Sequence, residues 1–240
     1  MKLCNYIKGT FIVGFILILH ATGYALKKKP NILYIMADDL GKEWISCYGA
    51  EDILTPNIDA LASGGIKFNN AYSMPACTPS RTTLLTGKYP WRTGWANHWD
   101  VPRWGVGYFD WKKKENTTFA RLMKDMGYTS AAAGKWQIND FRLEPKAMKK
   151  HGFDDWAMWT GCESSPDEKH EKKSTRRYWD PYINTPEGSK TYQGKYGPDL
   201  YTDRMIQFMR KHKEKPMCMY FPLAQPHTPV AVTPDEPKAK

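Results

Sequence analysis

Three stretches without charged side chains stand out along the chain, at residues 30–37, 128–134 and 216–221. Each has the length of a β-strand, and turn-forming or polar residues lie on either side of it. A run that is apolar nearly throughout, such as 30–37 or 216–221, is typical of a strand that is buried on both faces of a parallel sheet. We therefore predict three main strands, and a shorter one that begins at 66–68.

Apolar positions with helical spacing occupy the segments between these strands, at 55–65, 119–126 and 199–210. The first segment has Thr55 as its expected N-cap and Pro56 as its first helical residue. Strands that alternate with helices are typical of an α/β protein, so we predict a parallel-rich sheet with helices on both faces.

Two segments lack clear periodicity. Residues 91–111 are rich in tryptophan and predict a loop that either packs on the core or lines a substrate site. Residues 151–193 are polar, charged and aromatic, with several prolines. We predict an insertion with little regular structure there, lying over an active-site cleft.

The first residues have the pattern of a secretory signal. Lys2 and Lys8 form a basic start, and the apolar run 11–19 is too short to span a bilayer comfortably. Small residues follow that suit cleavage by a signal peptidase. We predict a signal peptide over 1–25 and a secreted or periplasmic protein without a stable membrane anchor; an uncleaved anchor is the alternative.

The formal net charge of the 240 residues is +10, which favours a polyanionic partner. The basic residues are spread along the chain, and no helix-turn-helix, zinc-finger or RNA-recognition pattern accompanies them. We therefore predict no nucleic-acid partner. The five cysteines show no C-x-x-C spacing, which argues against a zinc site.

Asp38 and Asp39 end the first apolar strand. Ligands of open α/β sheets gather at the carboxyl ends of strands, and hard divalent cations prefer carboxylate oxygens. The pair therefore predicts a metal site. The alternative is that one aspartate caps a turn while the other faces solvent.

The stretch from Cys77 to Arg81 reads C-T-P-S-R and precedes a helix-like run. Pro79 suits the first turn of a helix, so Thr78 is the expected N-cap and Cys77 lies just before it. A helix N-terminus stabilises anions and lowers the pKa of a thiol. Arg81 can project toward the same end. A buried structural cysteine with Arg81 in a surface ion pair is an equally good reading of these residues alone.

Two further groups follow strands. Lys135 and Gln137 follow the second apolar stretch in the sequence G-K-W-Q, and His227 follows the third in P-H-T-P. A single histidine is more often structural than catalytic, so local chemistry alone does not assign His227 a role.

These motifs, taken in order, resemble the sulfatase family. The resemblance covers residues 30–229 and rests on Asp38-Asp39, on C-T-P-S-R followed by T-T-L-L-T-G, on G-K-W and on P-H-T-P. It implies the fold shared by alkaline phosphatases and sulfatases. Members of the family continue well past the P-H-x-P segment, so we expect residues 26–240 to be the N-terminal portion of a catalytic domain that is truncated at its C-terminus.

The resemblance implies hydrolysis of a sulfate ester of a carbohydrate or an aryl alcohol. A maturation enzyme would oxidise Cys77 to formylglycine, whose hydrate is the nucleophile. Asp38, Asp39 and the oxidised Cys77 would hold a calcium ion, or magnesium in its place. Arg81 and Lys135 would neutralise the sulfate, and His227 would help the alcohol to leave.

Gln137 departs from the family pattern, which usually has a histidine there that contacts the nucleophile. Glutamine forms hydrogen bonds but does not exchange a proton near neutral pH, so the proton relay is altered or activity is reduced. Two alternatives stay open: a non-catalytic secreted binder of sulfated glycans, and a phosphatase or phosphodiesterase relative. Cys77 argues against the latter, because those enzymes carry serine or threonine as the nucleophile.

Overall fold

The computed structural model describes residues 28–96, 116–139, 141, 144–159 and 177–236. The chain divides into two units after Pro30, and the fold below is that of the described residues of Asn31–Lys240. The predicted signal peptide at 1–25 and most of the tryptophan-rich segment lie outside the described residues. In the part of the chain that is described, no helix combines the length and the apolar character needed to cross a bilayer.

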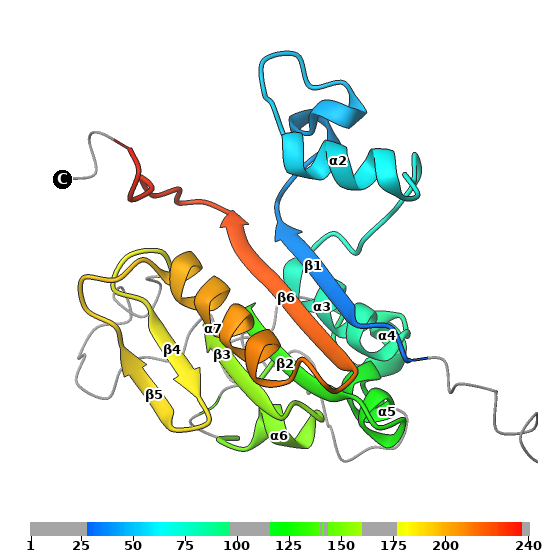
Figure 1. Cartoon of the computed structure of the whole chain (residues 1–240), viewed down its shortest axis with the longest axis vertical. Helices are drawn as coiled ribbons and strands as arrows, with labels where there is room; N and C mark the ends of the chain where they lie inside the picture. The colour runs from blue at the N-terminus through cyan, green and yellow to red at the C-terminus, as the bar shows by residue number, and fades with distance from the viewer. Residues whose placement is uncertain (1–27, 97–115, 140, 142–143, 160–176, 237–240) are drawn as a thin grey trace, which may run out of the picture. The chain divides into compact units, whose positions relative to one another are not determined.

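A six-stranded sheet forms the centre of this unit (Figure 1). Its strands lie in the order β1-β6-β2-β3-β4-β5, and the first four of these run parallel to one another. β4 pairs antiparallel with β3, and β5 pairs antiparallel with β4 as a hairpin. The strands are β1 (Ile32–Asp38), β2 (Thr129–Lys135), β3 (Asp155–Trp159), β4 (Tyr182–Thr185), β5 (Gly188–Thr191) and β6 (Met217–Pro226).

Helices cover both faces of the sheet, as predicted, with α7 on one face and α3 and α5 on the other (Figure 1). The helices are α2 (Pro56–Gly64), α3 (Cys77–Thr86), α4 (Pro90–Thr93), α5 (Phe119–Asp125), α6 (Ala147–Lys150) and α7 (Gly197–Lys211). Two short 3-10 turns, η1 (Lys42–Trp44) and η2 (Ser46–Tyr48), follow β1.

The alternation of side chains along β2 divides the core between these two faces. Ala131 and Ala133 pack in one cluster with α7 residues such as Tyr201. Ala132, between them, belongs to the opposite cluster, which contains Leu85 of α3. Small alanines on a central strand let both helical layers approach the sheet closely.

Gly134 is required where β2 passes β6. Its backbone has a φ of +123°, and a Cβ atom built there would lie 1.9 Å from the carbonyl oxygen of Pro222. Only glycine combines that conformation with that approach. This close approach brings the end of β2, and with it Lys135, against β6.

Two predictions of secondary structure are wrong. The segment predicted to be irregular, 151–193, contains β3 and the β4–β5 hairpin, because short runs of aromatic and β-branched residues such as 182–185 pair around a tight turn. Residues 66–68 form no strand and follow α2 as an exposed loop. What looked like an insertion therefore completes the sheet.

Strand β1 is also not buried on both faces. It is an edge strand of the described sheet and pairs only with β6. Leu33, Tyr34 and Ile35 are 45%, 42% and 52% exposed. An apolar strand is fully buried only where other parts of the protein pack around it, and in the described sheet β1 has a neighbouring strand on one side only.

His151 fixes the end of α6 against the core. Its Nε2 lies 3.0 Å from Oδ1 of Asn139, and its carbonyl accepts a hydrogen bond from the Thr118 hydroxyl that caps α5. The ring is fully buried beside Trp136. Burial, followed by the positive charges of Arg121 and Lys150, lowers the pKa of His151 to about 3.

This pKa predicts a specific loss of stability in mild acid. The folded protein resists protonation of His151, whereas the unfolded chain takes up the proton near the ordinary histidine pKa. The stability that depends on a neutral, buried His151 is therefore fully present above about pH 6.5 and is lost as the pH falls toward 3. Between pH 7 and pH 5, we expect the unfolding free energy to fall by about 2 kcal/mol for this reason.

Urea unfolding of the wild type and of His151→Gln at both pH values measures this contribution. Glutamine has an amide that can still donate to Asn139, and it does not titrate. We expect the variant to lose most of the difference in unfolding free energy between the two pH values. An unchanged difference would contradict the assignment.

Candidate functional site

The predicted site residues come from three neighbouring strand ends and one helix start. Asp38 is the last residue of β1, Lys135 is the last of β2, and His227 follows the last residue of β6. Asp38 is in register with Pro226, which places His227 next to the β1 end. Cys77 begins α3. Carboxyl ends of parallel strands are where α/β sheets bind ligands.

A buried group of two cations and one anion forms the floor of the site. Nζ of Lys135 lies 2.5 Å from Oδ2 of Asp38, and Nη2 of Arg81 lies 3.4 Å from Oδ1. The three side chains are 0%, 0% and 5% exposed, respectively for Lys135, Arg81 and Asp38. One negative charge faces two positive ones, so the group carries a net positive charge away from water.

Arg81 has hydrogen-bonding capacity left over. Its Nη1 donates to the carbonyl oxygen of Lys135 at 2.8 Å. Its buried Nε and Nη2 form no hydrogen bond with the residues that the structure describes, and Nη2 has only the 3.4 Å ion pair with Asp38. Buried guanidinium donors without acceptors are costly in a folded protein. They suit an anion that brings several acceptor oxygens.

The surroundings of Lys135 oppose its positive charge. Burial lowers the pKa of the ammonium group, and the nearby Arg81 charge lowers it further, while Cys77 and Asp38 act in the opposite direction. A further anion at this point would favour the charged ammonium. The local electrostatics thus match those of an anion-binding site.

Cys77 lies in the first turn of α3, slightly deeper in the helix than predicted. The N-cap is Ala76 and not Thr78, so the helix begins two residues earlier than the position of Pro79 indicated. The Thr78 hydroxyl instead donates to the carbonyl oxygen of Gln137 at 3.0 Å. Cys77 remains at the positive end of the helix dipole, as expected.

Gln137 contacts the sulfur directly. The Cys77 thiol donates to its Oε1, with 3.0 Å between the two atoms. Gln137 has a φ of +53°, a conformation that L-residues seldom adopt, and the turn that requires it aims the side chain at Cys77. A contact between the side chains at positions 137 and 77 is therefore present in the structure.

Asp39 and His227 form the outer rim. Nε2 of His227 lies 3.6 Å from Oδ2 of Asp39, which is 63% exposed. Asp39 has a φ of +62°, so the chain turns sharply after Asp38 and the two adjacent carboxylates serve different partners. Asp38 faces the buried cations, and Asp39 faces His227.

Two residues that hold His227 were not predicted from the sequence. Arg177 contacts Nδ1 of His227 at 3.0 Å, and the Tyr178 hydroxyl donates to the His227 carbonyl at 2.7 Å. Burial raises the pKa of Tyr178 to about 12, so its hydroxyl remains a donor. Both residues lie in the segment that was predicted to be irregular, where no periodic signal was available to place them.

A complete metal site is not formed by the residues that the structure describes. Nowhere among them do three histidine, cysteine, aspartate or glutamate side chains gather closely enough to hold an ion. The expectation that Asp38, Asp39 and Cys77 share a cation therefore stays a prediction.

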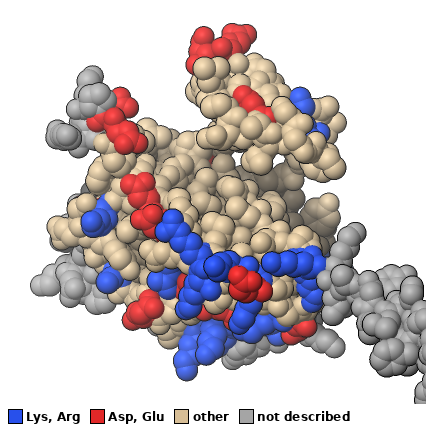
Figure 2. Space-filling view, viewed as in Figure 1, with Lys and Arg blue, Asp and Glu red and all other residues tan. Residues whose placement is uncertain are grey.

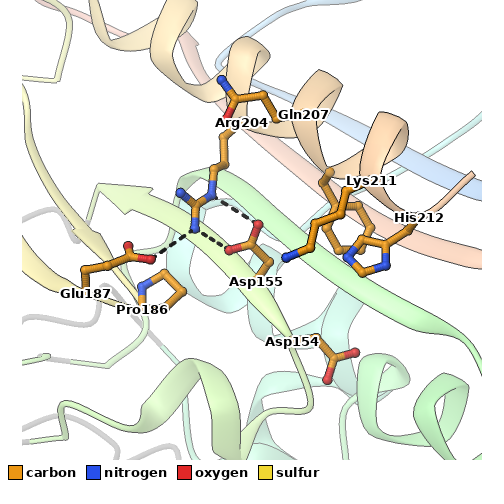
Figure 3. Close-up of a pocket in the computed structure, with 9 residues that line it drawn as sticks. Asp154, Asp155, Pro186, Glu187, Arg204, Gln207, Lys211 and His212 are labelled. Carbon is orange, nitrogen blue, oxygen red and sulfur yellow. Dashed lines mark hydrogen bonds and ion pairs between the residues drawn. The ribbon is translucent and has the colours of Figure 1, made fainter.

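A pocket of about 490 Å³ lies elsewhere, at the amino end of β3 (Figure 3). Arg204 of α7 donates to both carboxylate oxygens of Asp155, at 2.5 and 3.1 Å, and lies 3.8 Å from Glu187 of the hairpin turn. These contacts join α7 to β3 and to the turn between β4 and β5, with one guanidinium shared by two carboxylates. We interpret this pocket as a structural seam and not as a second active site.

Comparison with known proteins identifies the family. The sulfatase family model matches residues 30–240. The chain belongs to the sulfatase family. It is 33% identical over 202 residues to the N-acetylglucosamine-6-O-sulfatase of Bacteroides thetaiotaomicron, covering 83% of this chain. It is 47% identical over 115 residues to human steryl-sulfatase, covering 46% of this chain and 19% of that protein.

Solved structures agree with the sulfatase fold. A protein in complex with its substrate D-glucosamine-2-N,6-O-disulfate superposes with a TM-score of 0.66 at 32% identity, covering 84% of this chain and 35% of the other. The enzyme i-CgsB, in complex with a neocarrahexaose, gives a TM-score of 0.69 at 28% identity, covering 86% and 47%. The chain spans 31% of the length of the Bacteroides relative.

The different environments of Asp38 and Asp39 predict unequal effects on stability when each is replaced by asparagine. Asp38→Asn would leave the Lys135 and Arg81 charges buried without a counter-ion, so we expect a loss of about 3 to 5 kcal/mol in unfolding free energy. Asp39→Asn is the matched control, because residue 39 is exposed and asparagine tolerates a positive φ. We expect a change within about 0.5 kcal/mol for the control.

Chemical denaturation of the two variants at one pH tests this pair. Equal losses for both, or a loss below about 1 kcal/mol for Asp38→Asn, would show that the buried cations do not depend on Asp38.

Proposed function

We propose that this sulfatase hydrolyses sulfate esters of a carbohydrate at the site formed by Cys77, Arg81, Lys135 and His227. The observation that carries the proposal is the buried, net-positive group beneath Cys77, in which Arg81 retains guanidinium donors without acceptors. A sulfate group supplies a negative charge and several acceptor oxygens. It therefore satisfies both needs of this group at once.

Arg81 and Lys135 bind the charged end of the substrate in this proposal. Both side chains are fixed before the substrate arrives, Arg81 by the Lys135 carbonyl and Lys135 by Asp38. Fixed charges in a site that excludes water stabilise developing negative charge without having to reorganise. They hold the sulfur atom of the ester near the first turn of α3, where Cys77 lies.

Cys77 is suited to become the nucleophile. It begins a ten-residue helix and is partly exposed. A maturation enzyme and a substrate can therefore both reach it. Formylglycine at this position supplies a hydrated aldehyde oxygen for attack on sulfur. The Gln137 amide, 3.0 Å from the present sulfur atom, orients the group at position 77 by hydrogen bonding and carries no proton away from it.

His227 acts on the other side of the ester. Its Nε2 lies at the rim beside Asp39, where the alcohol part of a bound substrate would extend toward solvent. A hydrogen bond from this nitrogen to the bridging oxygen stabilises the charge that develops as the sulfur–oxygen bond breaks.

A calcium ion is the cofactor that the resemblance implies, and the described residues do not fit it completely. Carboxylates are suitable calcium ligands, but Asp38 is already paired with Lys135 and Arg81, and no three-ligand cluster is found in the described ranges. A calcium or magnesium ion at Asp38 and Asp39 needs further ligands. The roles proposed for Cys77, Arg81, Lys135 and His227 do not depend on this ion.

The substrate class rests on the relatives. The Bacteroides relative is named as an N-acetylglucosamine-6-O-sulfatase. An ulvan-active sulfatase is 32% identical to this chain, over 88% of its length. Lys and Arg form a band on one face of the protein, around the end of α7 (Figure 2), whose last turn contains Arg210 and Lys211. A basic surface favours the approach of a sulfated polysaccharide.

We further propose that residues 1–25 direct the protein out of the cytoplasm and that residues 26–240 belong to the catalytic domain. A secreted or periplasmic location would give access to polysaccharides too large to enter a cell. Conversion of Cys77 would then need a formylglycine-generating enzyme as a partner.

Sulfate release tests the function. The full-length gene product that contains this chain, co-expressed with a maturation enzyme, is incubated with 6-O-sulfated N-acetylglucosamine, 6-O-sulfated N-acetylgalactosamine, an aryl sulfate and an aryl phosphate. We expect release of sulfate from at least one sugar, and a fall of at least about 10³-fold in Cys77→Ala, because the variant has no precursor of the nucleophile.

The controls separate the alternatives. Faster hydrolysis of the phosphate than of every sulfate would favour a phosphatase relative. Retention on a sulfated glycan column without release of sulfate from any substrate would favour a non-catalytic binder. Either result would overturn the proposal.

A further inference from the structure

Arg177 forms a fork that holds both His227 and the residue after it. Its Nη1 lies 3.0 Å from Nδ1 of His227, and its Nη2 donates to the carbonyl oxygen of Thr228 at 2.6 Å. Only 7% of Arg177 is exposed. A planar guanidinium with two parallel donors is rigid, so it defines the position of the imidazole ring as well as its contacts.

The fork also decides which ring nitrogen of His227 carries the proton. Arginine has donors but no acceptor, so Nδ1 of a neutral His227 satisfies Arg177 only when Nδ1 accepts and the proton lies on Nε2. A competing arrangement exists in the same place. Nδ1 lies 2.5 Å from the Thr228 carbonyl oxygen and would donate to it if Nδ1 carried the proton. The two tautomers therefore differ in whether Arg177 is satisfied.

Other residues hold the fork in place. The guanidinium carbon of Arg177 lies 5.0 Å from the ring centroid of Trp159 at the end of β3. Tyr178, the next residue, donates to the carbonyl oxygens of Ala224 and His227 at 3.0 and 2.7 Å. The end of β3 and the segment before β4 thus fix the turn that follows β6.

We propose that Arg177 is a positioning residue that keeps His227 in the Nε2-protonated tautomer. Nε2 is the nitrogen that faces the rim, 3.6 Å from Asp39. The assignment of that N–H as donor to the leaving oxygen rests on the proposed sulfatase function, whereas the tautomer itself is argued from the buried Arg177 donor at Nδ1. Arg177 acts on the substrate only through His227.

Nitrogen NMR of the imidazole rings tests the tautomer directly. The protein is labelled with ¹⁵N-histidine and long-range ring correlations are recorded at about pH 8, where an ordinary histidine is neutral. His227→Gln identifies the signals of that ring. We expect the wild type to favour Nε2–H about tenfold or more, the scale of one charge-assisted hydrogen bond.

Arg177→Met should reverse this preference, because the Thr228 carbonyl then becomes the best partner of Nδ1 and accepts a proton from it. Arg177→Lys retains a cationic donor and should recover part of the Nε2–H population. Tyr178→Phe is the matched control: it removes a hydroxyl that holds the same turn through backbone carbonyls, and it should leave the tautomer unchanged.

An Nδ1–H tautomer in the wild type would overturn the proposal, and so would an Arg177→Met spectrum that matches the wild type. If Arg177→Met does not fold, the comparison of wild type, Arg177→Lys and Tyr178→Phe still decides it. An equal shift in the last two variants would indicate a general effect on the turn. None of these readouts depends on sulfate release, so failure here and failure of the proposed function are distinguishable.

Discussion

The contact between Asp38 and the two buried cations Lys135 and Arg81 is the constraint on which the site depends. It joins the ends of two strands to a helix that comes from elsewhere in the chain. Isolated charges are expensive to bury, so these three groups are acceptable inside the protein only together. Their arrangement leaves one positive charge uncompensated and some Arg81 donors without acceptors. Stability and anion binding thus rest on the same atoms.

The sheet supplies this arrangement through backbone geometry. Gly134 allows β2 to pass the β6 backbone closely, and the positive φ of Asp39 and Gln137 turns the chain sharply beyond each strand. As a result, residues close together in the sequence face different ways. Asp38 faces the cations while Asp39 faces His227, and Lys135 faces Asp38 while Gln137, two residues later, faces Cys77. The site has a buried floor that suits sulfate and an open rim that suits the rest of a sugar.

Much of this could be predicted from the sequence, because the signals are local. Asp38, Lys135 and His227 each follow a run that reads as a strand, and Pro79 marks a helix start to within two residues. Signals that depend on neighbours failed. The apolar run of β1 did not show that this strand lies at the edge of the described sheet. Arg177, in the charged segment before β4, was not predicted either, because its role depends on a contact with His227, which is distant in the sequence.

The proposed function depends above all on Cys77 as the precursor of an aldehyde nucleophile. Intact-mass and peptide mass analysis of protein co-expressed with a formylglycine-generating enzyme shows whether Cys77 is converted. Replacement of the thiol by an aldehyde removes about 18 Da from the peptide that contains Cys77. We expect this loss at Cys77 and at no other cysteine. An unmodified thiol at Cys77, under conditions in which a known sulfatase is converted, would show that the proposed nucleophile is wrong.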